Sequence, residues 1–201
     1  MIGTDDARLR LIAITDDLRD GAEGLVVRAR AAERGGASMV LLRLKHVDAH
    51  TLVEVGRALV SALAIPLLVS ERLDVALACG ASGVHLTSVS MPVIAIRAQV
   101  DAAFLIGGSV SAHSDVEHAR TADFVTIGPV FGAGALSLGV DGFRRLASEC
   151  GRPAVAIGGI DATTAGSLRA AGASGVAAIR AIFAADDPTA AATQLLHVAG
   201  S

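Results

Sequence analysis

The sequence predicts a (β/α)8 barrel, the TIM-barrel fold of the α/β class, as a single domain over residues 1–201. Three observations favour this fold: short apolar runs recur along the chain, helix-like stretches separate them, and one glycine motif returns three times. The two kinds of segment alternate about every 25 residues, a rhythm typical of parallel sheets. Eight such units fit the length of a compact barrel.

The expected strands are short apolar runs, and several of them are apolar on both faces. Strands of parallel sheets show this pattern because both faces of such sheets are covered. The runs are LRLIAIT (9–15), MVLLR (39–43), PLLVS (66–70), GVHL (83–86), FLIGGSV (104–110), FVTIG (124–128), PAVAIGG (153–159) and GVAAI (175–179).

Helical periodicity is clearest in four of the intervening segments, 25–36, 50–63, 163–172 and 188–200. The motifs GGAS, CGASG and AGASG each close a helix-like stretch before a strand, and their glycines Gly36, Gly80 and Gly172 fit the left-handed position that commonly ends a helix. An open doubly wound sheet is the competing fold. The G-x-G-x-x-G phosphate motif expected after its first strand is absent.

The composition indicates a well-buried globular protein with no nucleic-acid partner. It is 52% hydrophobic and 18% charged, with a net charge of −3, no Trp, no Tyr and five Phe. Cys79 and Cys150 have no metal-type spacing and suit free thiols in a reducing compartment. The first residues lack the apolar core of a signal peptide, and no uninterrupted apolar stretch reaches transmembrane length. A cytoplasmic protein without a membrane partner is expected.

The active site of such a barrel lies at the C-terminal ends of the strands. Residues that follow the apolar runs should therefore form one ring. Its cations, hydroxyls and single histidine favour an anionic ligand. The ring comprises Thr15, Asp16, Arg43, Lys45, Ser70, Glu71, Thr87, Ser88, Ser90, Ser109, Ser111, His113, residues 129–139, Gly158, Gly159 and Arg180.

Two cations follow the second strand. In the run MVLLRLK, side-chain alternation puts Met39, Leu41, Arg43 and Lys45 on one face. If both faces are covered, the two cations share an enclosed space, where isolated charges need a compensating partner. Either acidic side chains or an anionic ligand must supply it.

The seventh and eighth loops favour a phosphate site. Gly158 and Gly159 follow a strand, so bare backbone N–H groups can approach a ligand, and Arg180 follows the next strand in a short helical turn. Phosphate sites of this fold recur at these two loops. The alternative is that the glycines only permit a tight turn and that Arg180 is a solvated surface cation.

Three other polar residues have ordinary structural explanations. His113 could cap a helix or pair with Asp115. His85, inside GVHL, fits a hydrogen-bonded packing residue. Glu71 is followed by Arg72 and Asp74, so it could belong to a structural ion pair.

The order and spacing of AITDD, LLRLK, GASGVHL, SAH, GPVF, LGVDGF, PAVAIGGI and GVAAIRAIF resemble the thiamine phosphate synthase/TenI family over nearly the whole chain. Members are (β/α)8 barrels of thiamine biosynthesis. The synthase joins a pyrimidine pyrophosphate to a thiazole phosphate with Mg2+ and releases pyrophosphate. The TenI branch isomerises a carboxylated thiazole phosphate without a metal, using a histidine.

Resemblance to the synthase implies that Arg43 and Lys45 contact pyrophosphate, that Ser111 belongs to the site, and that Gly158 and Gly159 hold the thiazole phosphate. The chain departs from the synthase pattern at several positions. The family's Asn-Asp after strand three is Ser70-Glu71, and the Asp expected after GVHL-G-Q falls at Ser90.

Further departures affect two other loops. The Thr-x-Thr-Lys after GPVF is replaced by GAGALSLG (132–139), and a usual Ser near strand eight is Arg180. The TenI branch also lacks the acidic pair and the cationic loop, and His113 falls near its catalytic histidine. A metal-independent thiazole phosphate tautomerase is therefore the favoured hypothesis.

In this hypothesis the catalytic residues are His113, as general base and then acid, with Lys45 and Arg43 holding the developing negative charge. No cofactor is favoured. The substrate-binding residues are Ser70, Glu71, Ser90, Ser111, Gly158, Gly159 and Arg180.

Two alternatives stay open. One is thiamine phosphate synthase, joining hydroxymethylpyrimidine pyrophosphate and thiazole phosphate, with Mg2+ held at Glu71 because such sites can use one carboxylate plus substrate phosphates. The other is a non-catalytic barrel that binds thiazole or thiamine phosphates. All three readings imply small phosphorylated ligands, and a homo-oligomer is compatible with each.

Overall fold

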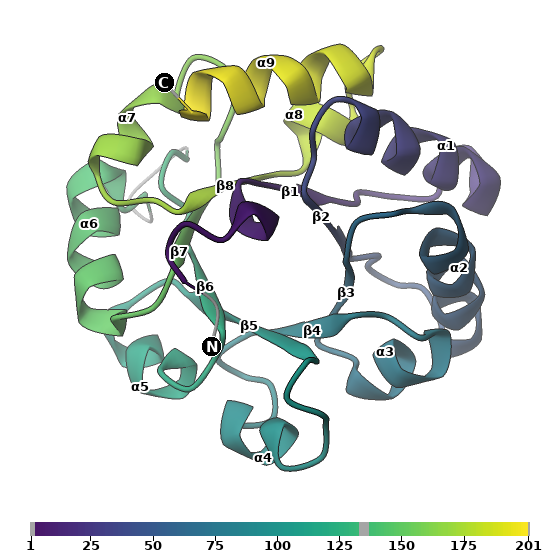
Figure 1. Ribbon diagram of the computed structural model, residues 1–201, viewed down its shortest axis with the longest axis horizontal. Helices are drawn as coiled ribbons and strands as arrows, with labels where there is room; N and C mark the ends of the chain where they lie inside the picture. The colour runs from purple at the N-terminus through teal and green to yellow at the C-terminus, as the bar shows by residue number, and fades with distance from the viewer. Residues whose placement is uncertain (1–2, 133–136, 201) are drawn as a thin grey trace.

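The computed structural model describes residues 3–132 and 137–200. Within these ranges eight parallel strands close into one barrel in chain order, with β8 pairing back to β1. Helices surround the barrel as an outer ring (Figure 1). The predicted single-domain (β/α)8 barrel is thus confirmed, and the open doubly wound sheet is not formed.

The strands begin within one or two residues of the apolar runs. They are β1 (Leu11–Ile14), β2 (Met39–Leu42), β3 (Leu67–Ser70), β4 (Gly83–Leu86), β5 (Leu105–Val110), β6 (Phe124–Ile127), β7 (Ala154–Ile157) and β8 (Gly175–Ala178). The helical segments are η1 (Ala7–Leu9), α1 (Gly21–Arg34), α2 (Ala49–Ala62), α3 (Leu73–Cys79), α4 (Val93–Arg97), η2 (His113–Asp115), α5 (Val116–Ala119), α6 (Gly139–Cys150), α7 (Gly166–Ala170), α8 (Arg180–Phe183) and α9 (Pro188–Gly200).

Glycines end the helices where the recurring motif predicts. Gly36, Gly80 and Gly172 have φ values of 99°, 74° and 90°, the left-handed region that glycine enters without a steric penalty. Helix α7 is shorter than its periodicity suggests. The carboxylate of Asp161 accepts hydrogen bonds from the N–H groups of Thr163 and Thr164, so these residues form a turn instead of the first helical turn.

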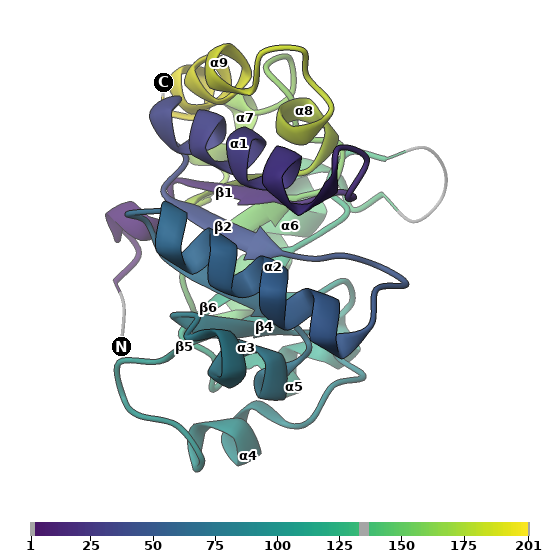
Figure 2. The same ribbon diagram turned by 90° about the vertical axis from the view of Figure 1, so that its right-hand side faces the viewer.

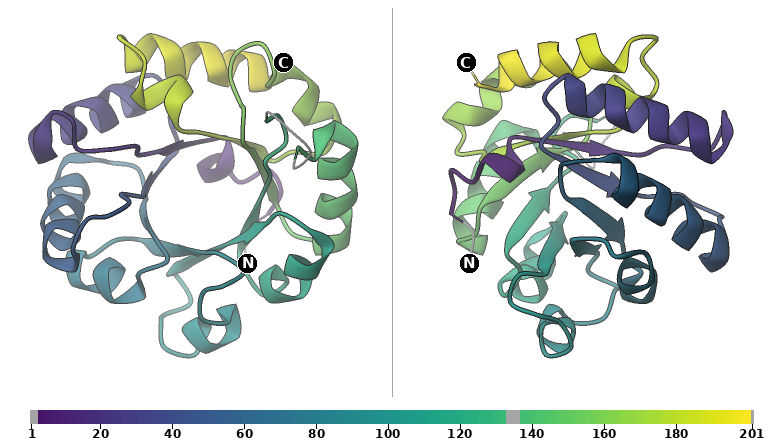
Figure 3. Two further views of the ribbon diagram at one scale, coloured as in Figure 1. Left: turned by 180° about the vertical axis from the view of Figure 1, so that it is seen from behind. Right: turned by 45° about the vertical axis from the view of Figure 1, so that its right-hand side comes forward.

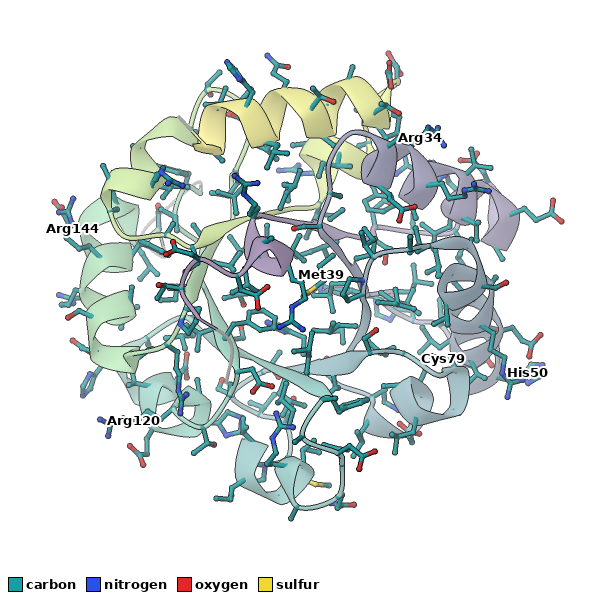
Figure 4. All side chains as sticks on the ribbon, in the orientation of Figure 1. Arg34, Met39, His50, Cys79, Arg120 and Arg144 are labelled. Carbon is teal, nitrogen blue, oxygen red and sulfur yellow. The ribbon has the colours of Figure 1, made fainter. Side chains whose placement is uncertain are left out.

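The side chains of β2 alternate as predicted. Met39 and Leu41 join an apolar cluster inside the barrel, whereas Val40 and Leu42 pack into the larger cluster between strands and helices. Figure 4 places the labelled Met39 side chain near the middle of the barrel. The barrel is therefore filled from within by alternate residues of its strands.

The N-terminal opening of the barrel is covered by η1. This segment lies over the opening in Figure 1 and behind it in the left view of Figure 3. Leu9 is fully buried in the inner apolar cluster. Figure 2 shows the loops that follow the strands on the opposite side of the molecule. This is the side on which the active site of such a barrel lies.

The barrel interior becomes polar near its C-terminal end. His85 on β4 is 6% exposed, and its Nε2 lies 3.0 Å from Oγ1 of Thr126 on β6. The His85 and Phe124 rings pack with centroids 6.0 Å apart. A Cβ at Gly107 would lie 2.6 Å from Cδ2 of His85 and 2.7 Å from Cζ of Phe124, so only glycine leaves room for both rings. The prediction that His85 is a hydrogen-bonded packing residue is confirmed.

Cys79 and Cys150 are both free and buried, and burial raises the pKa of each thiol. The structure thus agrees with the prediction of two unpaired thiols. Among the helices of residues 3–132 and 137–200, none combines the length and the apolar character needed to cross a membrane.

Gly107→Ala should lower the free energy of unfolding by about 1–3 kcal/mol, because the added methyl overpacks the space beside His85 and Phe124. Urea unfolding measures this change. Gly166→Ala is the matched control, since its Cβ would find its nearest neighbour, Cγ1 of Val198, at 3.5 Å in α7. Equal stability of the two variants would contradict the account of the interior.

Candidate active site

The carboxylate of Glu71 is held by residues of the neighbouring strand end. Glu71 follows β3 with a φ of 64°, the left-handed region that non-glycine residues rarely occupy. Its backbone N–H donates to the carbonyl of His85 at 2.8 Å. The Thr87 hydroxyl donates to Oε1 of Glu71 at 2.7 Å. Glu71 is exposed and takes no part in the Arg72–Asp74 ion pair, so the structural ion pair considered as its alternative role does not form.

Ser90 supports Thr87. Its Oγ accepts a hydrogen bond from the backbone N–H of Thr87 at 3.0 Å and lies 3.0 Å from the Thr87 hydroxyl oxygen. Because the Thr87 proton points to Glu71, Ser90 is the donor in the second contact. The Ser90 hydroxyl is thus engaged within the chain and reaches Glu71 only through Thr87.

Arg43 and Lys45 differ in exposure. Arg43 is half-buried, and its backbone N–H donates to Oγ1 of the fully buried Thr15 at 2.8 Å. The enclosed space expected for both cations does not extend to Lys45, which is exposed because the chain turns there with His46 at a φ of 63°. No carboxylate of the described residues forms an ion pair with Arg43 or Lys45.

His85 is the buried titratable side chain nearest in register to Ser70, which precedes Glu71. Burial is the main cause that lowers the pKa of His85 from 6.5 to about 4. The charge of Glu71 raises this pKa and that of Arg43 lowers it, so both charged groups are close enough to act on the ring. The His85 imidazole is therefore buried and neutral, and it lies within electrostatic reach of both charges. Ser70, half-buried, pairs in register with His85 at the end of β3.

Ser111 is fixed by Asp115. Oδ2 of Asp115 accepts from the N–H of Ser111 at 2.8 Å, from its hydroxyl at 2.7 Å and from the N–H of Ala112 at 3.1 Å. Although desolvation by burial opposes it, the net effect lowers the pKa of Asp115, since these bonds and one from the Ser88 side chain favour the carboxylate. Both donors of Ser111 are engaged with Asp115.

His113 turns away from the other site residues. Its side chain is 86% exposed, and Nδ1 lies 2.7 Å from Oε2 of Glu149 in the last turn of α6. The pairing with Asp115, one of the two structural alternatives for His113, does not form, since Asp115 accepts from Ser111. Because α6 belongs to the outer ring of helices (Figure 1), the structure does not bring His113 together with Arg43 and Glu71.

Gly158, Gly159 and Arg180 line one cavity of about 520 Å³, together with residues of β7 and β8. The two glycines have φ values of 93° and 66°. They are also required by packing, since a Cβ at Gly158 would lie 2.5 Å from Cα of Pro129 and one at Gly159 would lie 1.8 Å from the carbonyl oxygen of Phe131. Arg180 is exposed at the start of α8.

One expected loop is described only in part. Residues 133–136 of the segment 132–139 lie outside the described residues. At its end, the Ser137 hydroxyl donates to the carbonyl of Val130 at 2.6 Å.

Sequence reasoning gave no role to Thr87 or Asp115 in the site. Thr87 was predicted only to lie in the ring of residues that follow the strands, and Asp115 was considered only as a partner of His113. The signal for Thr87 was its place directly after β4, next to the strand that ends at Glu71. Asp115 had the weaker signal of a carboxylate four residues after Ser111, the spacing at which it meets that residue's N–H and hydroxyl.

The described residues contain no group of three or more His, Cys, Asp or Glu side chains that could hold a metal by themselves. Glu71 supplies one carboxylate, with Oε1 engaged by Thr87. A Mg2+ ion in proteins often has one or two carboxylate ligands and completes its coordination with water and substrate phosphates. The donor set fits a Mg2+ ion that arrives with a phosphorylated substrate.

An eight-stranded parallel barrel with these polar groups after its strands defines a (β/α)8-barrel protein with a polar site at the C-terminal ends of its strands. The family described as thiamine monophosphate synthase matches residues 11–182. The chain is 38% identical to the thiamine-phosphate synthase of Albidiferax ferrireducens, over 93% of this chain and 90% of that protein. It is equally identical to that of Chloroflexus aurantiacus, over 92% and 90%. The chain belongs to the thiamine monophosphate synthase/TenI family.

Solved structures agree with this assignment. Thiamine phosphate pyrophosphorylase from Pyrococcus furiosus superposes with a TM-score of 0.86 at 31% identity, covering 96% of both chains. A 3-hexulose-6-phosphate synthase superposes with a TM-score of 0.73 at 20% identity, covering 94% of this chain and 99% of that one, which shows the fold alone.

The tautomerase favoured by the sequence is contradicted by these findings. The relatives named above are synthases, which are transferases, and they match this chain over nearly its whole length. Closeness to the TenI branch is likewise not confirmed. The acid–base role of His113 belonged to the tautomerase hypothesis and falls with it.

The lowered pKa of His85 predicts a pH dependence of stability. Between about pH 6.5 and about pH 4 the unfolded chain binds a proton on His85 and the folded chain does not, so the free energy of unfolding falls as the pH falls through this window. Replacing His85 by Gln removes this contribution. The wild-type protein should lose up to about 3 kcal/mol relative to His85→Gln across the window, measured by urea unfolding. Parallel pH curves for the two proteins would contradict a neutral buried His85.

Proposed function

We propose that this protein is a thiamine-phosphate synthase, a transferase that joins hydroxymethylpyrimidine pyrophosphate to thiazole phosphate and releases pyrophosphate. The observation that carries the proposal is the 38% identity to proteins named thiamine-phosphate synthase over about nine-tenths of both chains. In this reaction the bond between the pyrimidine unit and pyrophosphate breaks, and the pyrimidine unit is transferred to the thiazole. The small phosphorylated substrates support a cytoplasmic location.

Arg43 and Lys45 would bind the pyrophosphate group. Neither has a carboxylate partner among the described residues, and Arg43 lies half-buried above the barrel interior, where its charge acts on His85. An unneutralised cation in such a place favours an anionic ligand. Ser70 ends β3 next to Glu71 and is half-buried. Ser111 lies at the rim of the barrel, and its donors would have to leave Asp115 before they could serve an anion.

Glu71 would hold a Mg2+ ion together with the pyrophosphate oxygens. Such an ion supplies positive charge that stabilises the departing pyrophosphate. The protein's part is to present one carboxylate oxygen while Thr87 engages the other. With Ser90 in place of an aspartate, the site carries one negative charge fewer, so the substrate must contribute more of the coordination.

Gly158, Gly159 and Arg180 would hold the thiazole phosphate. The cavity that they line has a volume of about 520 Å³, and its glycines present backbone without side chains. Arg180 adds a cation at the edge of this cavity. The Asp161 carboxylate in the same lining is occupied by Thr163 and Thr164, which reduces its repulsion of a phosphate.

The purified protein should form thiamine phosphate from the two substrates with Mg2+ and lose this activity with a chelator. Glu71→Gln should lower kcat/KM at least about tenfold, because the charge that holds the metal is removed. Product is quantified by conversion to a fluorescent thiochrome. Glu149→Gln, which alters a carboxylate on the outer helix α6, is the control and should retain activity. Binding of both substrates without any turnover would favour a non-catalytic barrel instead.

Arg180→Ala should raise the KM for thiazole phosphate by about tenfold, because one hydrogen bond to a charged group is worth about 1.5 kcal/mol. The KM for the pyrimidine pyrophosphate should stay unchanged, since this substrate binds near Arg43. Initial rates with each substrate varied in turn measure both constants. Equal changes in both KM values would contradict separate phosphate sites.

A further inference from the structure

Thr87 occupies a position where the synthase pattern GVHL-G-Q has glycine, and Ser90 stands where that pattern has aspartate. The two changes are coupled in the structure, since Thr87 and Ser90 are hydrogen-bonded to each other and Thr87 to Glu71. We infer that Thr87 is a positioning residue that fixes the Glu71 carboxylate for a divalent cation, with Ser90 fixing Thr87. This inference rests on the proposed function.

The backbone of Glu71 supports this role. A left-handed conformation at a residue other than glycine costs about 1–3 kcal/mol and persists only where the surroundings enforce it. Here the N–H of Glu71 is fixed by the His85 carbonyl at 2.8 Å and its side chain by Thr87 at 2.7 Å. The strain at φ 64° thus accompanies a side chain directed to the end of β4.

The hydrogen bonds form a directed chain. The N–H of Thr87 donates to Ser90 Oγ, the Ser90 hydroxyl donates to Thr87 Oγ1, and the Thr87 hydroxyl donates to Oε1 of Glu71. Each donor polarises the next, which strengthens the last bond to the carboxylate. Ser90 therefore acts through Thr87 and is not itself placed as a ligand.

This arrangement compensates for the missing aspartate. With two carboxylates, a cation can orient both by attraction. With Glu71 alone, the longer and more flexible side chain must be fixed by the protein. Thr87 occupies Oε1 of Glu71, which leaves Oε2 for the cation.

The test measures cation binding directly. Free Mn2+ is followed by electron paramagnetic resonance while it is titrated into an equimolar mixture of protein and inorganic pyrophosphate, and the same titration without protein gives the Mn2+ that pyrophosphate alone binds. Thr87→Val removes the hydroxyl at nearly constant volume and should weaken Mn2+ binding about three- to tenfold, the value of one hydrogen bond. Thr87→Ser keeps the hydroxyl and should restore wild-type affinity. Thr193→Val, which removes a hydroxyl from the distant helix α9, is the matched control.

Thr87→Gly guards against misfolding of the valine variant, because glycine is the residue of the synthase pattern and tolerates any backbone conformation. It should weaken Mn2+ binding as Thr87→Val does. If Glu71→Gln weakens Mn2+ binding while Thr87→Val and Thr87→Gly retain wild-type affinity, Thr87 is not a positioning residue, although the proposed function stands. If Glu71→Gln binds Mn2+ as the wild type does, both the metal role of Glu71 and this inference are overturned.

Discussion

The inside of the barrel has to be filled by side chains from alternate positions of eight short strands, and this packing constraint governs the rest of the structure. Near the N-terminal end the filling is apolar, with Met39, Leu68 and Leu9 of η1 in one cluster. Towards the C-terminal end it includes His85 and Thr126. Their hydrogen bond satisfies two polar groups that would otherwise be buried without a partner. Polar groups of the site can therefore stand directly above the core.

The buried layer and the site affect each other through charge. His85 is neutral because burial disfavours the imidazolium, and it lies within reach of both Glu71 and Arg43. A protonated His85 would add positive charge beneath a half-buried arginine. Because Gly107 leaves room for the His85 ring, it allows this neutral imidazole to lie next to the charged site residues. His85 therefore belongs to the packed core and also interacts electrostatically with the site.

The substitutions that favoured a tautomerase have a different meaning in three dimensions. Along the sequence, Glu71 and Ser90 appear as a weakened acidic pair. His113 appears there as a general base and acid near the position of the TenI catalytic histidine. In the folded chain, Thr87 joins Glu71 to Ser90, and Glu149 engages His113 on the outer side. Side-chain direction after a strand depends on one or two backbone angles, such as the φ of 64° at Glu71, which residue spacing does not specify.

The sequence by itself determined the barrel, its eight strands, the glycines that end three helices and the family resemblance. The barrel, its strands and the glycines follow from periodicity and local backbone preferences, which act over a few residues, whereas the resemblance rests on the order and spacing of motifs along the chain. The sequence also placed Arg43, Glu71 and Arg180 after their strands. Only the tertiary structure decided that Lys45 is exposed, that Asp115 engages Ser111, and that Thr87 holds Glu71. The reason is physical: two of these contacts depend on how adjacent loops close, and the exposure of Lys45 depends on where the chain turns away from the barrel.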